Sequence, residues 1–600
     1  MLAWHFALYF RSGAPRRQYF PPIRLSNHAA HRIAAGPDHK CFSLEMVMKR
    51  ILYALVVALL LAPLGYAASG GTISGGITGP DGAPFRAAFI RAQNVKTKMT
   101  MMVLSDNRGK YSTEKLPAGT YEVWATATGY KSDPAKRANV TLQEDQTATV
   151  DLTMQKTSVR WSQLTKYQGG VLLPEGKGKD VVLQQCFNCH AMSKIGVEGR
   201  DRDSWLEAIE HMRQVGVADI KPDVADQVAE YLEKVFGPDS EIPKSPAQLP
   251  QYQKVKQDRD YFSDDALNIV YVDYQLTGEP KDRPGTGKID KDGNIWMEMG
   301  GGLSKLDPAT GELHTWRLPD PSRPFIHEVL PTSDGSVWLT IEAQNKLAKF
   351  DTRSEKFEVY GEKYDGPPPA EMEPNAPWPN LRYTTGGQTG APRRHTAVAD
   401  FQGNIWSSGR PLSKFDIETK KFTFFPDVPD TYGITVDQEG NVWFAEFNSR
   451  DHHSIGKVDV KTNKITKWTP PGSDSRPRRL KIDSQGMVWF GDYFGGNLTR
   501  FDPKNQTFKE FKLPGPMPTP YGMGIDHNDN IWYASMYTDV IGKLEPKTGK
   551  VTEYPSPYGE RGTRDMFEDS QGRIWYGAQP YMKVGYVRPR TPSQKAIAQK

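Results

Sequence analysis

The sequence has little cysteine and no long hydrophobic run. Three Cys among 600 residues are too few for a disulfide framework. The longest apolar run, residues 51–61, is shorter than the roughly 20 residues that a spanning helix needs, and the chain is too polar for a multi-span membrane protein. Lys and Arg (76) nearly balance Asp and Glu (71), so no charge excess favours nucleic acid as a partner. The 11% aromatic content excludes a disordered protein.

The N-terminal segment is organised like an export signal. Lys49 and Arg50 precede the apolar run, and small residues around Ala67 supply a cleavage site. We interpret residues 46–68 as a Sec-type signal peptide and residues 1–45 as a mis-assigned upstream segment, with an Arg-rich transit peptide as the alternative. This signal predicts a periplasmic or secreted bacterial protein. Once the signal is cleaved, we expect the mature chain to have no stable membrane span and to keep two cysteines.

Residues 70–155 have the pattern of a small all-β domain. Alternating runs such as 89–93 and 121–127 are separated by turns rich in Gly, Pro, Asn and Asp. The phrases at 79–84, 105–111, 116–123 and 128–130 resemble those of the carboxypeptidase regulatory-like domain. The resemblance implies a β-sandwich of seven or eight strands without chemistry of its own, serving as a spacer or as a carbohydrate- or partner-contacting module.

Two helices are predicted between polar linkers at 156–180 and 238–262. Trp205, Ile209 and Met212 recur at helical spacing, and Pro222 opens a second helix that ends before Gly237. We therefore expect residues 181–237 to form a small all-α domain.

This helical segment carries the sharpest motif of the chain. Cys186 and Cys189, followed at once by His190, form the C-x-x-C-H sequence that attaches c-type haem, with two thioether bonds and His190 as the iron ligand. A zinc site would need two further ligands, and a thioredoxin-like pair would lie near a βαβ pattern, which does not surround this motif. The segment 200–232 resembles small single-haem cytochrome c domains. That resemblance implies Met212 as the second axial ligand, with His211 and Met192 as alternatives.

The remainder, residues 263–590, repeats a phrase of the form Asp-x-x-Gly-x-hydrophobic-Trp. The repeats end at Trp296, Trp406, Trp443, Trp489, Trp532 and Trp575, with a looser copy at Trp338. A unit of about 43 residues that holds four strands is a propeller blade. The repeats predict seven blades, with an insertion at 367–392. Residues 269–274 form an extra strand that could close the ring by pairing with residues 584–587.

The propeller phrases resemble those of the virginiamycin B lyase (streptogramin lyase) family. The resemblance rests on two kinds of repeated phrase, exemplified by residues 443–446, from Trp443 to Glu446, and by residues 455–459. The resemblance implies a Mg²⁺-dependent elimination that uses a His on an inner strand and an acid after the Trp of the same blade. No single blade holds both groups, so His395, Glu446 and Tyr432 are the candidate catalytic residues across neighbouring blades.

Basic residues gather where the inner strands of the propeller should begin. The residue 11 positions before each Trp is expected to line the central funnel, and clustered guanidinium groups suit an anionic ligand. The substrate-binding candidates are His327, Arg394, Arg478 and Arg564.

Together these patterns predict a multidomain, mainly β protein with a small β-sandwich, a small all-α cytochrome c domain and a seven-bladed β-propeller. The favoured function is periplasmic electron transfer by one covalent haem c, reduced by a partner protein or a small molecule, with oxidation of a small anionic substrate at the propeller as an extension. The alternatives are a Mg²⁺-dependent lyase of the streptogramin type and a non-enzymatic scaffold for a redox partner.

Overall fold

The structure is a computed structural model, and it describes residues 70–590 apart from 134–136, 188–189, 215–219, 258, 280–281, 283, 286, 323, 362–392, 448–452, 473–474 and 560–561. The expected signal peptide at 46–68, the segment 1–45 and the insertion at 367–392 lie outside the described residues. The described part belongs to the second of two compact units, Ala68–Lys600. Within it, no helix is long and apolar enough to cross a membrane.

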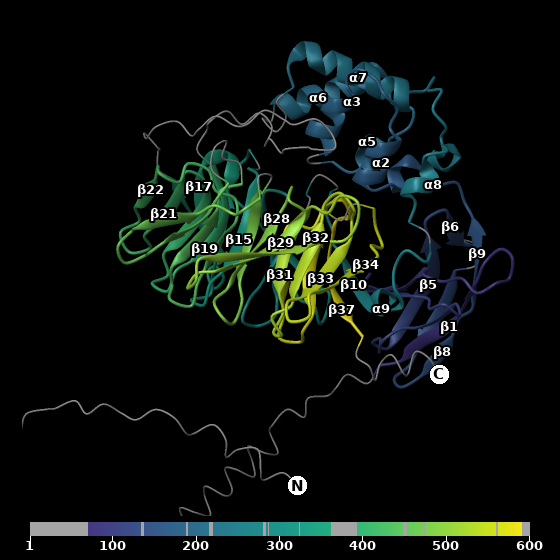
Figure 1. The fold of residues 1–600 in the computed structure, drawn as a ribbon. Helices are drawn as coiled ribbons and strands as arrows, with labels where there is room; N and C mark the ends of the chain where they lie inside the picture. The colour runs from purple at the N-terminus through teal and green to yellow at the C-terminus, as the bar shows by residue number, and fades with distance from the viewer. Residues whose placement is uncertain are drawn as a thin grey trace, which may run out of the picture. The chain divides into compact units, whose positions relative to one another are not determined.

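Most of the described chain folds into seven four-stranded antiparallel blades (Figure 1). Blades one to three contain β11 (Lys288–Ile289), β12 (Ile295–Met299), β13 (Gly302–Leu306) and β14 (Leu313–Arg317); β15 (Ile326–Pro331), β16 (Ser336–Ile341), β17 (Lys346–Asp351) and β18 (Lys356–Gly361); β19 (Arg393–Ala399), β20 (Ile405–Arg410), β21 (Leu412–Phe415) and β22 (Phe422–Phe425).

Blades four to six contain β23 (Ile434–Val436), β24 (Val442–Ala445), β25 (Ile455–Val458) and β26 (Ile465–Trp468); β27 (Pro477–Ile482), β28 (Val488–Asp492), β29 (Asn497–Asp502) and β30 (Thr507–Lys512); β31 (Pro520–Ile525), β32 (Ile531–Ser535), β33 (Ile541–Glu545) and β34 (Lys550–Tyr554). Blade seven combines the two ends of the propeller, with β35 (Met566–Glu568), β36 (Ile574–Ala578), β37 (Lys583–Pro589) and β10 (Ile269–Gln275).

The predicted ring closure is confirmed. Strand β10 pairs antiparallel with β37 from Ile269↔Pro589 to Gln275↔Lys583, so the first propeller strand completes the last blade. The pairing satisfies the backbone groups that both strands would otherwise leave at an open edge.

The repeated Asp and Trp form the same contact in six blades. Each Asp precedes a tight turn, its Oδ1 accepts backbone N–H groups of that turn, and its Oδ2 accepts the indole N–H of the Trp six residues later. The six Trp Nε1 to Asp Oδ2 distances are 2.8 Å (Asp290–Trp296), 2.9 Å (Asp400–Trp406), 2.9 Å (Asp437–Trp443), 2.8 Å (Asp483–Trp489), 3.0 Å (Asp526–Trp532) and 2.7 Å (Asp569–Trp575). The motif thus fixes a turn and anchors the buried indole in the blade core.

The N-terminal strands form the predicted β-domain. Its strands are β1 (Thr72–Thr78), β2 (Phe89–Asn94), β3 (Thr100–Leu104), β4 (Lys110–Ser112), β5 (Gly119–Ala127), β6 (Tyr130–Ser132), β7 (Ala138–Leu142), β8 (Thr147–Thr149) and β9 (Leu152–Lys156). Strand β3 pairs with the outer edge of β10, with Tyr271 opposite Met102. The β-domain therefore continues the sheet of blade seven. Its buried apolar residues form one hydrophobic core with apolar residues of blade one.

Two short 3-10 helices, η6 (Glu342–Gln344) and η7 (Gln579–Tyr581), lie in blades two and seven, and the other helices of the described residues lie between these two β regions. The latter are η2 (Trp161–Gln163), α2 (Lys166–Leu172), α3 (Lys179–Val181), the π-helix η3 (Val182–Cys186), α5 (Met192–Ile195), α6 (Arg202–Gln214), α7 (Pro222–Phe236), η4 (Pro246–Gln248), α8 (Tyr252–Val255) and α9 (Asp264–Leu267). The two helices predicted from periodicity correspond to α6 and α7, with Trp205 and Ile209 buried. We call residues 161–255 the helical module.

The structure differs from the sequence prediction at the two linkers. Helix α2 falls within 156–180, α8 falls within 238–262, and both segments pack into the core of the helical module. Trp161 is 1% exposed, and Tyr252 is also buried. In both segments the apolar side chains are few and widely spaced among Gly, Lys and Pro, so the composition alone favoured linkers.

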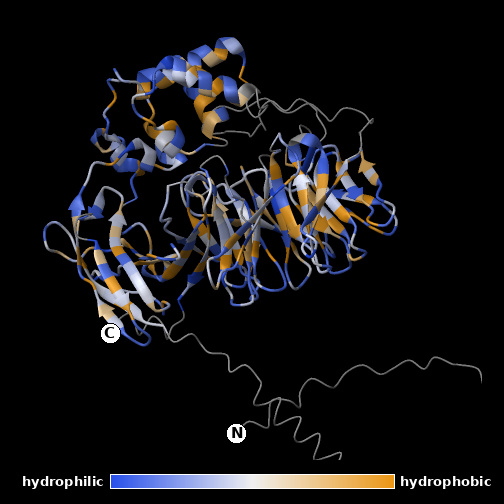
Figure 2. Cartoon of the chain, turned by 180° about the vertical axis from the view of Figure 1, so that it is seen from behind, coloured by the Kyte–Doolittle hydropathy of each residue, from blue (hydrophilic) through white to orange (hydrophobic). Residues whose placement is uncertain are grey.

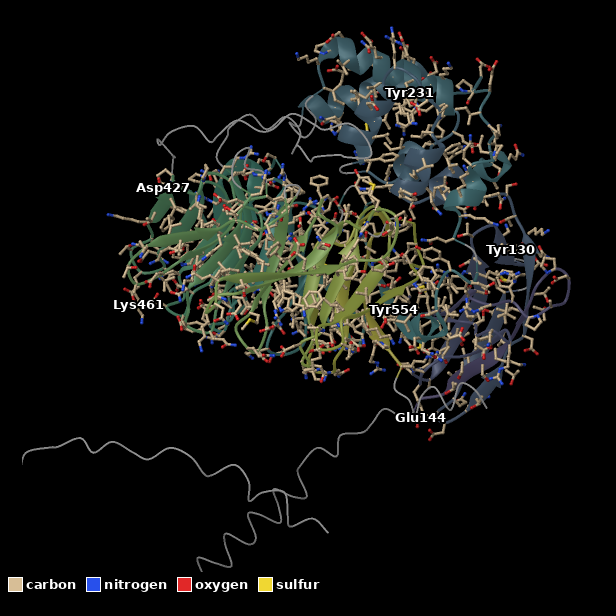
Figure 3. All side chains as sticks on the ribbon, viewed as in Figure 1. Tyr130, Glu144, Tyr231, Asp427, Lys461 and Tyr554 are labelled. Carbon is tan, nitrogen blue, oxygen red and sulfur yellow. The ribbon has the colours of Figure 1, made fainter. Side chains whose placement is uncertain are left out.

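Hydropathy follows this architecture. Figure 2 shows hydrophobic residues inside the blades and hydrophilic residues in the turns that connect the strands. In the helical module, Tyr231 of α7, labelled in Figure 3, is buried, and its hydroxyl donates to the carbonyl of Pro174 at 2.8 Å. This bond ties α7 to the chain between α2 and α3.

Candidate functional site

The inner strands of several blades bring four predicted residues into one aromatic row. His327 on β15 lies against His395 of β19, with ring centroids 3.5 Å apart and ring planes tilted by 33°. His395 in turn lies 4.1 Å from the ring of Tyr432, which precedes β23. The Tyr432 hydroxyl makes a short hydrogen bond with that of Tyr521 on β31. Residues 11 positions before their Trp therefore meet across blades two, three, four and six.

Arg478 occupies the same position in blade five and is enclosed by aromatic rings. Its guanidinium carbon lies 3.6 Å from the ring centroid of Tyr521 and 4.4 Å from that of Tyr493, and Nη2 donates to the Tyr432 hydroxyl at 3.1 Å. Cation–π contacts of this kind stabilise a buried guanidinium. Burial raises the pKa of Tyr432 to about 12. Burial also acts to raise the pKa of Tyr521, but Arg478 and the nearby arginines outweigh it and lower that pKa to about 8.

A pocket opens beside this row, and we call it the funnel pocket. It is lined by Glu298, Phe325, His327, Glu328, Arg479, Arg564, Asp565 and Gln579. Ion pairs surround it. Lys288 pairs with Asp565 and lies 3.5 Å from Glu328, Lys481 lies 2.9 Å from Asp565, and Arg479 lies 3.6 Å from Glu328.

Protonation states in the funnel pocket follow from burial and from these charges. Burial, joined by the neighbouring carboxylate of Glu328, raises the pKa of Glu298 to about 8. Burial and the guanidinium groups of Arg479 and Arg564 hold the pKa of His327 well below its usual range. Burial, with His327 and Arg479 beside it, does the same to the pKa of His395. At neutral pH the pocket therefore presents a protonated carboxyl group, the neutral imidazole of His327 and two guanidinium groups, and the neutral imidazole of His395 lies against His327.

Two predicted residues lie elsewhere in the blades. Glu446 is fully buried, and its carboxylate accepts from the Ser454 hydroxyl at 2.8 Å and from Lys467 Nζ at 2.7 Å. Arg394 donates to the Ser413 hydroxyl and lies over the ring of Phe424. Both side chains contact outer strands of their own blades. We correct the expectation for Arg394, because its guanidinium is held by Ser413 and Phe424 on the third and fourth strands of its blade and does not line the funnel pocket.

Sequence reasoning missed Lys288, Lys481, Asp565 and Phe325, and Arg479 was not among the substrate-binding candidates. Glu328, Arg479 and Asp565 each follow the predicted funnel position by one residue. Strict strand alternation would turn them away from the funnel. The register shifts at this point in β15 and β27, and a β-bulge allows consecutive side chains to reach the same side. In the sequence, a charged residue directly after a predicted funnel position is the signal that could have indicated Glu328, Arg479 and Asp565.

The helical module holds the residues predicted to bind haem. Cys186 ends η3, its carbonyl accepts from the His190 backbone N–H at 2.7 Å, and Cys189 lies outside the described residues. Met212 on α6 is half-buried and His211 is exposed. Met192 is fully buried against Gly169. The three candidates for the second axial ligand therefore differ in exposure.

The helical module packs on the aromatic end of the funnel. Its core forms one hydrophobic cluster with Tyr432, Phe447, Tyr493, Tyr521, Met536 and Tyr537 of the propeller, and Cys186 packs against this cluster. The backbone N–H of Tyr167 donates to the carbonyl of Tyr537 at 3.0 Å. The module that carries the C-x-x-C-H sequence is thus continuous with the aromatic row that borders the funnel pocket.

The predicted Mg²⁺ has no evident ligand cluster. No group of three or more His, Cys, Asp or Glu side chains within the described ranges is arranged to hold a metal ion.

Comparison with known proteins supports the two β regions. Residues 417–594 match the Virginiamycin B lyase family, and residues 72–155 match the Carboxypeptidase regulatory-like domain. No curated protein matches the chain. We therefore assign lyase-like propeller repeats to the first region and a regulatory-like domain to the second.

Three of the solved structures that are similar to this chain are compared with it by identity, coverage and TM-score. Virginiamycin B lyase from Staphylococcus aureus is 18% identical, with 53% of this chain and 99% of that chain covered and a TM-score of 0.44. A streptogramin B lyase structure is 19% identical, with coverages of 55% and 100% and a TM-score of 0.46. An extracellular domain assigned to a hybrid two component system from B. thetaiotaomicron is 13% identical, with coverages of 53% and 40% and a TM-score of 0.41.

Proposed function

We propose that this protein is an exported c-type haem protein that transfers electrons, with the propeller as its ligand- or partner-binding part. One observation carries the proposal: the sequence Cys186-x-x-Cys189-His190 lies in a helical module whose core is continuous with the funnel aromatics. A haem held there is close to the binding part of the protein. Electron transfer between a bound donor and the haem then needs no large movement.

The residues of the helical module fit a covalent haem. Cys186 and Cys189 would form the thioether bonds, His190 would bind the iron, and Met212 would be the second axial ligand. The indole N–H of Trp205 supports this fit, because it is buried and has no hydrogen-bond partner among the described residues. Trp205 lies two helical turns before Met212 on α6, where a haem propionate could accept its hydrogen bond.

When bound, haem c supplies reversible one-electron chemistry at iron. The chain contributes the surroundings. Buried Leu183, Phe187 and Ile209 exclude water from the core beside the motif. The guanidinium of Arg200 lies 4.8 Å from the ring centroid of Trp205, so it would place a positive charge near a propionate that bonded the indole N–H. A methionine sulfur as axial ligand raises the reduction potential relative to a second histidine.

The test is a visible spectrum of protein coexpressed with the cytochrome c maturation machinery, followed by a pyridine haemochrome assay on the denatured chain. Covalent haem is expected in the parent and is expected to be lost in Cys186→Ala. Met212→Ala should retain covalent haem but lose the sulfur-to-iron charge-transfer band, whereas Met192→Leu should keep that band. A parent protein without haem after maturation overturns the electron-transfer function.

Export belongs to the same proposal. The segment 46–68 would direct the chain to the periplasm or the medium, where c-type haem is attached, and the donor would be a redox protein or a small molecule there. Fractionation of cells that express the full chain tests this. Cytoplasmic retention of a chain that begins at Met46 would contradict export.

A second candidate function is a Mg²⁺-dependent lyase, favoured by the family match at 417–594 and by the neutral imidazole of His395. A neutral imidazole can accept a proton. Linearisation of a cyclic depsipeptide that requires Mg²⁺ and is lost in His395→Ala would support it. A stable complex with a redox protein and no turnover would instead support the scaffold function.

A further inference from the structure

We propose that the funnel pocket binds a small aromatic carboxylate, with the carboxylate held by Arg479 and Arg564 and the ring packed on Phe325. This inference deepens the ligand-binding part of the proposed function, and it does not depend on the haem.

Two buried polar atoms at the pocket need a ligand acceptor or donor. His327 is 9% exposed and Arg479 is 4% exposed. His327 Nδ1 and Arg479 Nε have no hydrogen-bond partner among the described residues. A buried polar group without a partner is destabilising, so native proteins rarely leave two of them beside one pocket. A carboxylate can accept from the Arg479 Nε–H.

The charges around the pocket favour an anion. Asp565 is shared by Lys288 and Lys481, and Glu328 lies between Lys288 and Arg479. These two carboxylates therefore balance only part of the positive charge that surrounds them. The third acidic side chain, Glu298, is protonated at neutral pH, because burial raises its pKa to about 8. A protonated carboxyl group can donate to a bound anion and does not repel it.

A carboxylate suits these groups better than phosphate. Planar guanidinium groups bind a carboxylate in a bidentate manner. The carboxylates of Glu328 and Asp565 also line the pocket, so each additional negative charge on a ligand would be repelled.

The apolar part of the ligand is inferred from Phe325. This ring lines the pocket yet is 55% exposed, and it meets the imidazole of His327 edge to face with centroids 6.2 Å apart. An exposed aromatic side chain at the rim of a charged pocket provides a surface on which a second ring can stack. A ligand whose carboxylate enters the pocket would place its ring against Phe325.

The test is titration calorimetry of the full chain at neutral pH with benzoate, acetate and phosphate as separate probes. Benzoate is expected to bind at least tenfold more tightly than acetate, and phosphate is expected to bind most weakly. Phe325→Ala should reduce benzoate affinity by about tenfold, which corresponds to 1.4 kcal/mol, and leave acetate affinity unchanged. Phe401→Ala is the matched control, since Phe401 is a 72% exposed phenylalanine that does not line the pocket.

Arg479→Lys tests the anion-binding part, because lysine keeps the charge but lacks the planar donor fork. A loss of benzoate binding of at least tenfold, with an unchanged circular dichroism spectrum, supports the proposal. Equal benzoate and acetate affinities, or unchanged benzoate binding in Phe325→Ala, overturn it even if Arg479→Lys fails to fold. Phosphate binding tighter than benzoate also overturns it. The same titration on protein made without haem maturation separates the two proposals, because benzoate binding should persist there.

Discussion

Asp483→Ala should destabilise blade five strongly, because the carboxylate is bonded to a buried indole as well as to two backbone N–H groups. Its Oδ1 accepts from the backbone N–H groups of Gln485 at 3.0 Å and Met487 at 2.9 Å, and its Oδ2 accepts from Trp489 Nε1 at 2.8 Å. Asp483 is 6% exposed and the Trp489 side chain is fully buried. The substitution removes a charge-assisted bond and leaves the indole N–H without a partner.

The expected loss is about 3–5 kcal/mol in the free energy of unfolding. A hydrogen bond to a charged group contributes about 1.5–3 kcal/mol, and an unsatisfied buried donor costs about 1–3 kcal/mol. The backbone N–H groups add less, because water can reach the turn once the carboxylate is gone. The assay is equilibrium urea unfolding followed by far-ultraviolet circular dichroism.

Asp502→Ala is the matched control. Asp502 also accepts two backbone N–H groups in a turn, from Lys504 at 2.9 Å and Asn505 at 3.1 Å, and the side-chain amide of Asn505 at 2.8 Å, but it is not bonded to an indole. Its loss should cost clearly less than the loss of Asp483, because its carboxylate is solvated and leaves no buried donor behind. Combining Asp483→Ala with Trp489→Phe isolates the bond between carboxylate and indole, with a coupling energy of about 1.5–3 kcal/mol expected. Equal costs for the two Asp variants, together with a coupling near zero, would refute the assigned role of the motif.

Three further predictions concern the helical module, the funnel pocket and the joint between β-domain and propeller. Gly169→Ala should lower the thermal unfolding midpoint and the haem yield, because an added Cβ would lie 2.3 Å from Met192 Sδ; an unchanged midpoint would refute this packing argument. Benzoate affinity should fall as pH rises through about 8, since Glu298 then ionises and repels the anion; Glu298→Gln should remove that dependence, and a fall that persists would assign it to another group. Val272→Pro should lower the unfolding midpoint, because Val272 lies opposite both Tyr586 and Met101 in a continuous sheet; no change would show that β10 is dispensable.

The repeats in the sequence predicted the propeller because each blade carries its own local signal. The Asp-to-Trp spacing determines a turn, a buried indole and a strand without help from distant residues, and six blades form the same contact. Ring closure was predictable for a similar reason, since a spare strand at one end matched a missing strand at the other. The C-x-x-C-H sequence is likewise local, and the haem that it indicates stays a prediction.

The funnel pocket was only partly predictable. Counting back from each Trp located His327, His395, Tyr432, Arg478 and Tyr521, which the structure brings into contact through successive blades. The same count could not reveal which neighbouring side chains share the funnel, because bulges in the inner strands break the alternation on which it depends.

Sequence by itself determined the local elements of this protein: the blades, the two amphipathic helices, the regulatory-like domain and the haem-attachment sequence. Tertiary structure alone decided how these elements combine. The pairing of β3 with β10, the packing of α2 and α8 into the helical module, and the ion pairs of Asp565 with Lys288 and Lys481 join residues that are far apart in the chain. Such contacts depend on edges, faces and buried charges that form only when the whole ring has closed, so no local pattern records them.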